Sequence, residues 1–304
     1  MGAETIILGD WGTSNLRLLL LEEGEVSARA EGPGIGLATD RPEHIFKELT
    51  KNWPKVPALL CGMVGSSIGW VETDYIPTPA GLDDLSAGLK HFDANGQRIC
   101  IIPGLSTTNA LGAPDFMRGE ETQLLGALRE DPTLHQGRHL LCLPGTHTKW
   151  LVLEDGVVQR FQTALTGEIY AIILKHSVLA GCAMPGCDVD ATAFDKAVAR
   201  VQAQEGAGFL HQVFETRAQQ LSGALERDHA ASFLSGLFIG EDVRGALASI
   251  AKDFDKNQPV QVIGAPVMGR CYCEALKAFG VKAQWRDGAQ LSLSGLRHFA
   301  EHLS

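Results

Sequence analysis

The chain has 304 residues, of which 45% are hydrophobic and 20% are charged, as is typical of a globular protein. This length usually exceeds what one hydrophobic core serves, so we expect two lobes, residues 1–130 and 131–304, that meet in a polar stretch. The formal net charge of -10 argues against nucleic acid as a partner, because its phosphates would be repelled. An anionic substrate must therefore meet a local positive patch.

Cysteine usage and the absence of apolar signals predict the location of the protein. The seven cysteines mostly lie within apolar runs, which is typical of buried thiols in a reducing compartment. The pairs Cys182/Cys187 and Cys271/Cys273 lack partners at the usual zinc spacing, so we expect no metal there. The N-terminus has no secretory signal pattern, and no run approaches the roughly 18 apolar residues of a membrane span. We expect a cytoplasmic protein without a membrane partner.

The first 30 residues predict three strands, with an acidic, glycine-containing turn after the first. Apolar runs at 5–9 and 16–21 flank that turn, and 25–30 is the third strand. Glycine allows backbone N–H groups to face an anion, and an acid at a strand end can hold a screening cation. An ordinary tight hairpin explains the same pattern. The candidate residues are Asp10, Gly12, Thr13, Ser14 and Asn15.

A helix over residues 42–53 then leads to a buried strand over 57–61. That strand delivers the glycine-rich run 62–70 at its C-terminal end, where open sheets place ligands. Backbone amides, hydroxyls and an aromatic side chain suit a polyhydroxy ligand, although a flexible glycine loop has the same composition. The candidates in this run are Met63, Gly65, Ser66, Ser67 and Trp70.

An irregular rim over 73–81, a short helix over 83–92 and a buried strand over 98–102 follow. The next helix opens with Arg118, Glu120 and Glu121, and its leucines recur at helical spacing. Acids in a first turn are favoured by the helix dipole, so both glutamates can be capping charges.

The second lobe repeats the opening pattern of the first. A strand over 139–143 precedes a second Gly-Thr turn, 133 residues after the first, and 157–163 pairs back across Asp155-Gly156. Two such turns that face each other across a cleft can hold two ends of one polyphosphate. The turn contains Gly145, Thr146, His147, Thr148 and Lys149, of which Lys149 either adds charge or points to solvent.

The rest of the chain alternates helices and strands. Residues 166–168 cap a helix that we expect near the cleft, and 190–251 is mainly helical. A buried strand over 260–264, a helix over 267–279, a strand over 281–285 and a helix over 294–302 follow. Apolar residues at helical spacing in 190–251 indicate core rather than cofactor contacts.

The paired Gly-Thr hairpins resemble the two phosphate loops of the actin, hexokinase and Hsp70 superfamily. Within it, the runs 10–17, 62–70, 117–126 and 144–150 are similar to the 2-dehydro-3-deoxygalactonokinase family. The resemblance covers nearly the whole chain, and the longer runs are its specific part. It implies an α/β, two-lobed actin/hexokinase-like (ribonuclease H-like) fold, in which mixed sheets flanked by helices enclose an ATP cleft.

The resemblance also implies ATP- and Mg²⁺-dependent phosphorylation of 2-dehydro-3-deoxy-D-galactonate to its 6-phosphate, in galactonate catabolism. Asp10 then holds Mg²⁺ and the two turns hold the phosphates. Glu121 is the expected base, because Glu121-Thr122-Gln123 resembles the Asp-x-Gln element of sugar kinases, with Glu120 as its rival. Arg118 is the candidate residue that binds the substrate carboxylate, because a guanidinium group can form two hydrogen bonds with a carboxylate. The alternative is a surface arginine or an ion pair with a neighbouring acid.

Gly264 and Ala265 occupy the turn that carries a glycine pair beside adenosine in the superfamily, with Ala265 in place of the second glycine. The glycine-rich run 62–70 is the expected contact of the sugar acid. Two alternatives remain open: a kinase of the same superfamily for another sugar, and a nucleotide-dependent binding module that is not a kinase. A homodimer also remains open, with no residue to support it.

Overall fold

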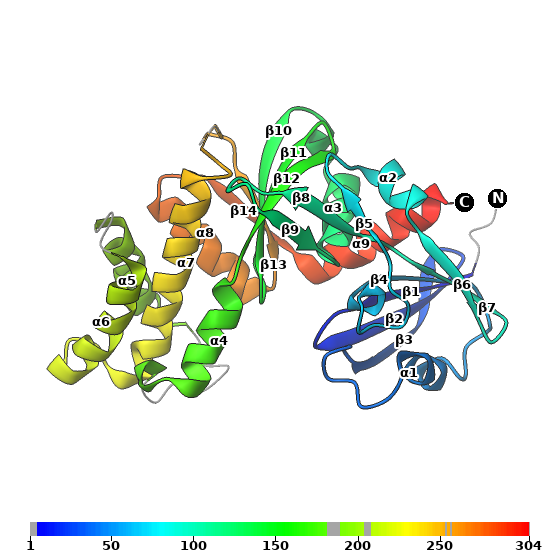
Figure 1. Cartoon of the computed structure of the whole chain (residues 1–304), viewed down its shortest axis with the longest axis horizontal. Coiled ribbons are helices and arrows are strands. Elements are labelled where there is room, and N and C mark those ends of the chain that lie inside the picture. Colours follow the sequence, from blue (N-terminus) through cyan, green and yellow to red (C-terminus); the bar gives the residue numbers. More distant parts are fainter. Residues whose placement is uncertain (1–4, 181–188, 204–207, 253, 256, 304) are drawn as a thin grey trace.

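The computed structural model describes residues 5–180, 189–203, 208–252, 254, 255 and 257–303. Figure 1 shows two β-sheets that lie in different parts of the molecule, each flanked by helices. The first sheet has the strand order β3-β2-β1-β4-β7-β6. Its strands are β1 (Ile6–Trp11), β2 (Asn15–Glu22), β3 (Glu25–Pro33), β4 (Ala58–Gly62), β6 (Lys90–Ala94) and β7 (Gln97–Ile101).

The second sheet repeats the topology of the first, with the order β12-β11-β10-β13-β14. In each sheet three antiparallel strands are followed by two parallel ones, and the first sheet adds the antiparallel edge strand β6. Because a Gly-Thr turn joins the first two antiparallel strands of each set, the two turns occupy equivalent places in the two lobes. The strands are β10 (Arg138–Leu143), β11 (Thr148–Glu154), β12 (Val157–Ala164), β13 (Val260–Gly264) and β14 (Ala283–Asp287).

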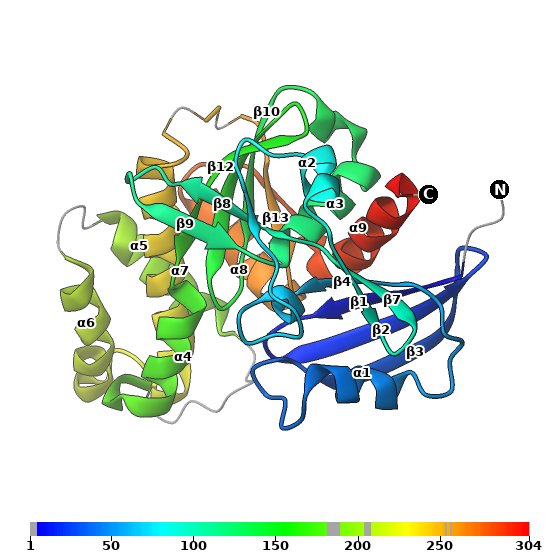
Figure 2. The same cartoon turned by 45° about the vertical axis from the view of Figure 1, so that its right-hand side comes forward.

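A small third sheet, β5-β8-β9, joins the first half of the chain to the second sheet. It lies beside β12 in both cartoon views (Figure 2). Ala80 and Val158 exchange two backbone hydrogen bonds of 3.1 and 2.9 Å. Asp115 accepts hydrogen bonds from the backbone N–H and the hydroxyl of Thr163, at 2.8 and 2.5 Å. The strands are β5 (Tyr75–Pro77), β8 (Gly104–Thr108) and β9 (Pro114–Met117).

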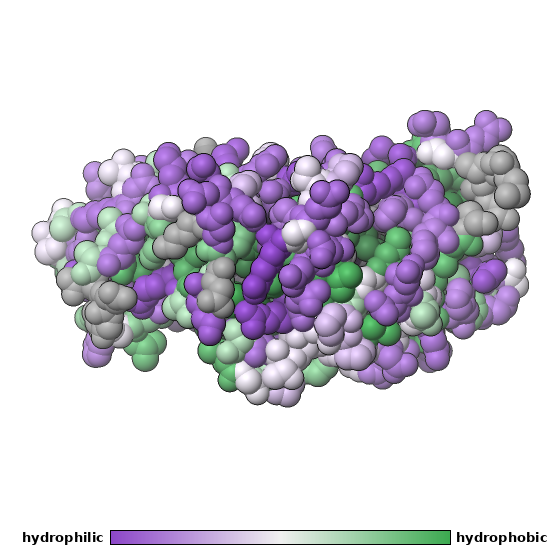
Figure 3. Space-filling view, turned by 90° about the horizontal axis from the view of Figure 1, so that it is seen from above, coloured by the Kyte–Doolittle hydropathy of each residue, from purple (hydrophilic) through white to green (hydrophobic). Residues whose placement is uncertain are grey.

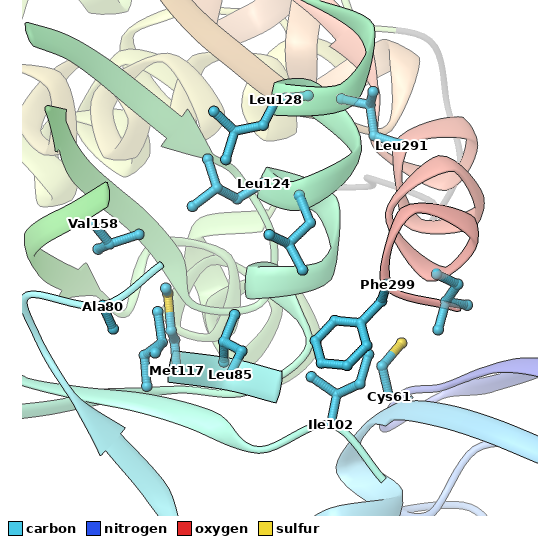
Figure 4. Close-up of a cluster of buried hydrophobic side chains, with 14 of the residues drawn as sticks. Cys61, Ala80, Leu85, Ile102, Met117, Leu124, Leu128, Val158, Leu291 and Phe299 are labelled. Carbon is cyan, nitrogen blue, oxygen red and sulfur yellow. The ribbon is translucent and has the colours of Figure 1, made fainter. Parts of the chain in front are cut away.

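Two helices, α3 and α9, pack along each other between the sheets. A Cβ atom on Gly126 would lie 2.0 Å from the Leu291 carbonyl oxygen, and one on Gly295 would lie 1.9 Å from that of Thr122. The close crossing therefore requires glycine on both helices. Figure 4 shows leucines of α3 and Leu291 and Phe299 of α9 in a buried cluster that also includes residues of both large sheets. The helices span Glu120–Glu130 (α3) and Gly288–His302 (α9).

The remaining helices cover the sheets and form one end of the molecule (Figure 1). α7 is buried around most of its circumference, as its nearly uniform apolar composition requires. The α-helices are α1 (Pro42–Leu49), α2 (Leu82–Ala87), α4 (Thr166–His176), α5 (Ala191–Ala203), α6 (Phe209–Ser222), α7 (Ala230–Ala248) and α8 (Pro266–Ala278). The 3-10 helices are η1 (Met63–Gly65), η2 (Pro132–His135), η3 (Val178–Ala180) and η4 (Arg227–His229).

Several predicted boundaries were wrong for local reasons. The helix predicted over 83–92 ends at Ala87, and strand β6 begins at Lys90. The terminal helix begins at Gly288 rather than 294, because the Asp287 side chain caps it by accepting from the N–H groups of Ala289 and Gln290, at 2.8 and 3.1 Å. The predicted rim over 73–81 contains the short strand β5.

Hydrophilic residues cover most of the face in Figure 3, and the described cysteines are free thiols. No helix within the described residues has the length and apolarity needed to cross a bilayer. Cys271 is buried and Cys273 is partly buried, and both are free thiols. Cys182 and Cys187 lie outside the described residues.

Candidate active site

A cavity of about 370 Å³ lies between the two Gly-Thr turns. Residues of the first turn, residues of the second turn and the start of α3 all line it. The two turns that the sequence analysis expects to face each other therefore do share one cleft. Its lining includes Asp10, Gly12, Thr13, Met63, Tyr75, Phe116, Arg118, Glu120, Gln123, Gly145, Thr146, His147 and Lys149.

The first turn is held from behind by the loop that follows β3. The Ser14 carbonyl accepts a hydrogen bond of 3.1 Å from Gly34, and the Gly12 carbonyl accepts one of 2.9 Å from Ile35. A Cβ atom on Gly34 would lie 2.4 Å from the Thr13 backbone, so glycine is needed for this contact. Within the turn, Gly12 donates its N–H to the Asn15 carbonyl at 2.9 Å. Ser14 and Asn15 are exposed and lie outside the cavity lining.

Asp10 is the penultimate residue of β1 and lines the cavity. Burial raises the pKa of its carboxyl group, while Arg17, its cross-strand partner on β2, and a hydrogen bond with Ser292 act in the opposite direction. The Cys61 thiol lies 3.9 Å from Asp10 Oδ1. The Arg17 guanidinium group favours the ionised form of the Asp10 carboxyl group. The ionised carboxylate is the form that binds a metal ion.

The second turn is held by the start of α4. Glu168 donates its backbone N–H to the Thr146 carbonyl at 2.9 Å, and its carboxylate contacts His147 Nε2. Gly167 is needed there, since a Cβ atom would lie 2.2 Å from the Gly145 carbonyl oxygen. The expectation that residues 166–168 lie near the cleft is confirmed.

A buried acid on α7, which the sequence analysis missed, ties the second turn to the helices behind it. Asp242 accepts hydrogen bonds from Trp150 Nε1, Thr166 Oγ1 and the Tyr272 hydroxyl, at 2.8, 2.6 and 2.5 Å. Tyr272 in turn lies 2.8 Å from the Thr148 hydroxyl. Burial raises the pKa of Asp242. The available signal was an acidic residue in a helix of mostly apolar composition.

Glu120 and Glu121 open α3 but lie in different places. Glu120 lines the cavity and accepts the Arg118 N–H at 3.1 Å. Glu121 has no exposed surface, and the Gly119 N–H lies 2.8 and 2.7 Å from its two carboxylate oxygens. Burial, and then the charge of Glu120, raise the pKa of Glu121 to about 8. Burial also raises the pKa of Glu120, and the Lys149 cation opposes this.

Arg118 is held on two sides. Its Nη2 donates to the Thr73 carbonyl at 2.9 Å, Nη1 contacts the Thr73 hydroxyl, and Cζ lies 4.3 Å from the centre of the Tyr75 ring. A Cβ atom on Gly65 would lie 2.9 Å from Nη1, so the glycine makes room for the guanidinium group. The arginine is thus fixed by a hydrogen-bonding residue and an aromatic face, and it still lines the cleft.

The structure brings only part of the predicted sugar-acid run to the cavity. Met63 lines it, whereas the Ser66 hydroxyl is directed to the Met63 carbonyl at 2.7 Å and Ser67 is exposed outside the lining. Trp70 packs among the aromatic rings of Trp11, Phe46 and Phe92, at centroid distances of 6.5, 5.4 and 5.3 Å. The aromatic residues at the cavity are Tyr75 and Phe116, which the sequence analysis missed because both lie in short strands without a motif.

Lys149 does not point to solvent. It is 5% exposed, and its Nζ donates to the Phe116 carbonyl and the Thr163 hydroxyl, both at 2.9 Å. Gly264 and Ala265 lie outside the cavity lining. The Gly264 carbonyl accepts a hydrogen bond of 3.0 Å from Trp285 Nε1, and Ala265 is the exposed N-cap of α8.

The structure is similar to a crystal structure of a Sinorhizobium meliloti protein assigned as a 2-dehydro-3-deoxygalactonokinase, with a TM-score of 0.87, 33% identity, and coverage of 98% of this chain and 96% of the other. The activator of the 2-hydroxyisocaproyl-CoA dehydratase from Clostridium difficile shares the fold at a TM-score of 0.52 and 12% identity, over 99% and 97% of the two chains. These likenesses confirm the two-lobed, actin/hexokinase-like α/β fold.

Sequence comparisons identify the family. The chain is 32% identical over 295 residues to the 2-dehydro-3-deoxygalactonokinase of Escherichia coli (strain K12), with 96% of each chain covered. It is 35% identical over 296 residues to a Rhizobium meliloti (strain 1021) protein named as a probable 2-dehydro-3-deoxygalactonokinase, with 94% of each covered. The model of the family described as 2-keto-3-deoxy-galactonokinase matches residues 10–299. The chain therefore belongs to the 2-keto-3-deoxy-galactonokinase family of carbohydrate kinases.

Proposed function

We propose that this protein transfers the γ-phosphoryl group of ATP to 2-dehydro-3-deoxy-D-galactonate and forms the 6-phosphate. One observation carries the proposal: a single cavity is lined by both Gly-Thr turns, by Glu120 and by Arg118. Phosphoryl transfer to a sugar acid needs amide-rich turns for phosphates, a proton acceptor for the attacking hydroxyl and a cation for the carboxylate. Membership of the kinase family supports the identity of the substrate.

Asp10 is the proposed holder of Mg²⁺. Proteins usually bind this ion through one or two carboxylates together with substrate phosphates, so a single acid beside a phosphate-binding turn fits it. Asp10 meets this description, and in the described part of the chain no cluster of three or more metal-ligating side chains offers a separate site. When bound, Mg²⁺ offsets the charge that develops on the transferred phosphoryl group.

The proposed nucleotide contacts follow the two turns. Residues 12–15 and 145–148 hold the phosphates, and the turn between β13 and α8, at buried Gly264 and exposed Ala265, lies on the adenosine side. Hydrogen bonds and close glycine contacts from neighbouring segments hold both turns in place, which supports this assignment. Amide groups that are fixed before binding need no reorganisation when the phosphates bind. The two lobes, 1–130 and 131–304, each contribute one turn.

We assign the base to Glu120 rather than to Glu121. A general base must come within hydrogen-bond reach of the hydroxyl whose proton it accepts. The place of Glu120 in the cavity lining supports this role, whereas Glu121 has no exposed surface and keeps its proton below about pH 8. The proposed role of Glu121 is to accept the hydrogen bond of the Gly119 N–H and so to fix the start of α3.

Arg118 is the proposed partner of the substrate carboxylate. Its contacts with Thr73 and Tyr75 support this role, because a guanidinium group held in one orientation can bind a carboxylate without losing further side-chain freedom. Met63, Tyr75 and Phe116 then contact the sugar chain directly. The loop behind these three side chains is shaped by Gly65, Ser66, Ser67 and Trp70.

Two coarser properties complete the proposal. Five described cysteines are free thiols, which supports a cytoplasmic location.

A homodimer is supported by an exposed apolar face on α6, where Leu210, Phe214 and Leu221 are 84%, 62% and 69% exposed. Sedimentation of the wild type and of Phe214→Ser tests the dimer, since an unchanged monomer in both would exclude it.

The deciding experiment measures ADP release with 2-dehydro-3-deoxygalactonate for wild type, Glu120→Gln and Glu121→Gln. We expect turnover by the wild type, a loss of about 10²- to 10⁴-fold in kcat for Glu120→Gln, and less than about 10-fold for Glu121→Gln. Loss in Glu121→Gln alone would return the base to that residue. An ATP-binding wild type that releases ADP only with neutral sugars would overturn the substrate assignment.

A further inference from the structure

Lys149 joins three strands at the edge of the cleft. It stands on β11, yet its ammonium group donates to the Phe116 carbonyl on β9 and to the Thr163 hydroxyl on β12, each at 2.9 Å. Thr163 is itself bound by Asp115, the residue before Phe116. β9 runs directly into Arg118 and Glu120, so the lysine fixes the segment that presents both groups to the second lobe.

The same ammonium group is the main cation acting on Glu120 from the second lobe. Lys149 is 5% exposed and lines the cavity together with Glu120, so water screens its charge poorly. The other titratable or charged groups around Glu120 are His147 on the second turn, and Arg118 and Glu121 on its own segment. Asp10 lines the same cavity. Burial disfavours an ionised Glu120, and the Lys149 cation opposes this effect.

We propose that Lys149 is a positioning residue for phosphoryl transfer, which holds β9, and with it Arg118 and Glu120, against the second lobe and places a cation in the cavity that the proposed base lines. The inference rests on the proposed function, because it takes Glu120 as the base. It differs from the phosphate-contact role that the sequence suggests for this lysine: two N–H groups of the ammonium are already directed to protein oxygens.

The test compares pH profiles of kcat/KM for wild type, Lys149→Met, Lys149→Gln and Lys149→Arg. Gln keeps a hydrogen-bond donor without the charge, Met removes both, and Arg keeps the charge. Without the cation the pKa of Glu120 rises, so the acidic limb of the profile should move to higher pH by about 0.5 to 1 unit in the Met and Gln variants. Lys149→Arg should restore the limb. Lys277→Met, at an exposed lysine, controls for the change in net charge.

The outcomes separate this inference from the proposed function. An acidic limb that stays in place in Lys149→Gln, with wild-type thermal stability, would overturn the charge role even if kcat falls. A rise in the KM for ATP of about 10-fold or more, with no shift of the limb, would return Lys149 to phosphate contact. If the wild type shows no turnover of the sugar acid, the proposed function fails, and the pH profile is not reached.

Discussion

Glu120 and Glu121 are adjacent in the sequence, but one faces the cleft and the other is completely buried. The first turn of α3 separates them, because successive helical residues point in directions about 100° apart. Glu121 accepts the Gly119 N–H and has a pKa of about 8, whereas Glu120 lines the cavity. Their different environments lead to separate predictions for activity and stability.

The stability of the protein should depend on the protonation of Glu121. Its folded-state pKa of about 8 lies above the ordinary value of 4.5, so its contribution to stability is complete below about pH 4.5 and is lost as pH rises toward 8. Glu121→Gln removes this loss. The Tm of the variant relative to wild type should therefore increase by roughly 3 °C or more between pH 5 and pH 8.5.

Differential scanning fluorimetry across this pH range makes the measurement. Glu25→Gln is the matched control at an exposed position and should leave the pH dependence unchanged. A constant Tm difference between Glu121→Gln and wild type from pH 5 to pH 8.5 would contradict the assignment of a buried, proton-binding Glu121.

Substitution of Arg118 should weaken binding of the sugar acid more than it slows the chemical step. Loss of a charged hydrogen bond costs about 1.5–3 kcal/mol, so Arg118→Ala should raise the KM for the acid about 10-fold or more. Arg118→Lys should recover little, because a lysine cannot contact Thr73 and a carboxylate in the same planar arrangement. Steady-state kinetics with Arg41→Ala as an exposed control tests this, and an unchanged KM in Arg118→Ala would exclude the carboxylate role.

Asp242 should affect nucleotide binding although it does not line the cleft. It holds Thr166 directly and Thr148 through Tyr272, so its loss loosens the second turn. Asp242→Asn should raise the KM for ATP by about 5-fold or more and lower stability by about 1–3 kcal/mol, with little change in the KM for the sugar acid. Kinetics at saturating levels of each substrate make the comparison, and a selective rise in the sugar-acid KM would contradict this role.

The crossing of α3 and α9 should be intolerant of any side chain at Gly295. A Cβ atom there would meet the Thr122 carbonyl oxygen at 1.9 Å, so Gly295→Ala should destabilise the fold by about 2–3 kcal/mol or more. Gly245 on α7 has no atom within 4 Å of the same position, and Gly245→Ala should stabilise slightly, by up to about 1 kcal/mol. Chemical denaturation of both variants would reveal the contrast, and equal effects would argue against a tight crossing.

Much of the architecture could be predicted because it depends on local patterns. Both hairpins, the strands β4 and β13 and the helices α3 and α8 follow from apolar periodicity and from glycine at the turns. The repeated Gly-Thr pattern also predicted that the two turns share a cleft, since equivalent positions in duplicated sheets lie at equivalent edges.

The direction of individual side chains was decided only by tertiary structure. Trp70 was expected at the ligand, but other aromatic rings surround it, and Tyr75 and Phe116 line the cleft instead. Lys149 was consistent with solvent or with phosphate, and its two partners come from β9 and β12.

The sequence by itself therefore determined the elements, the duplicated turns and the family, because each depends on residues that are close together in the chain. Only the tertiary structure decided which glutamate faces the cleft, and which residues hold Arg118 and the second turn. Those choices depend on contacts between segments that are far apart in sequence, as between Asp242 and Thr166 or between Gly295 and Thr122. Local periodicity contains no information about such contacts.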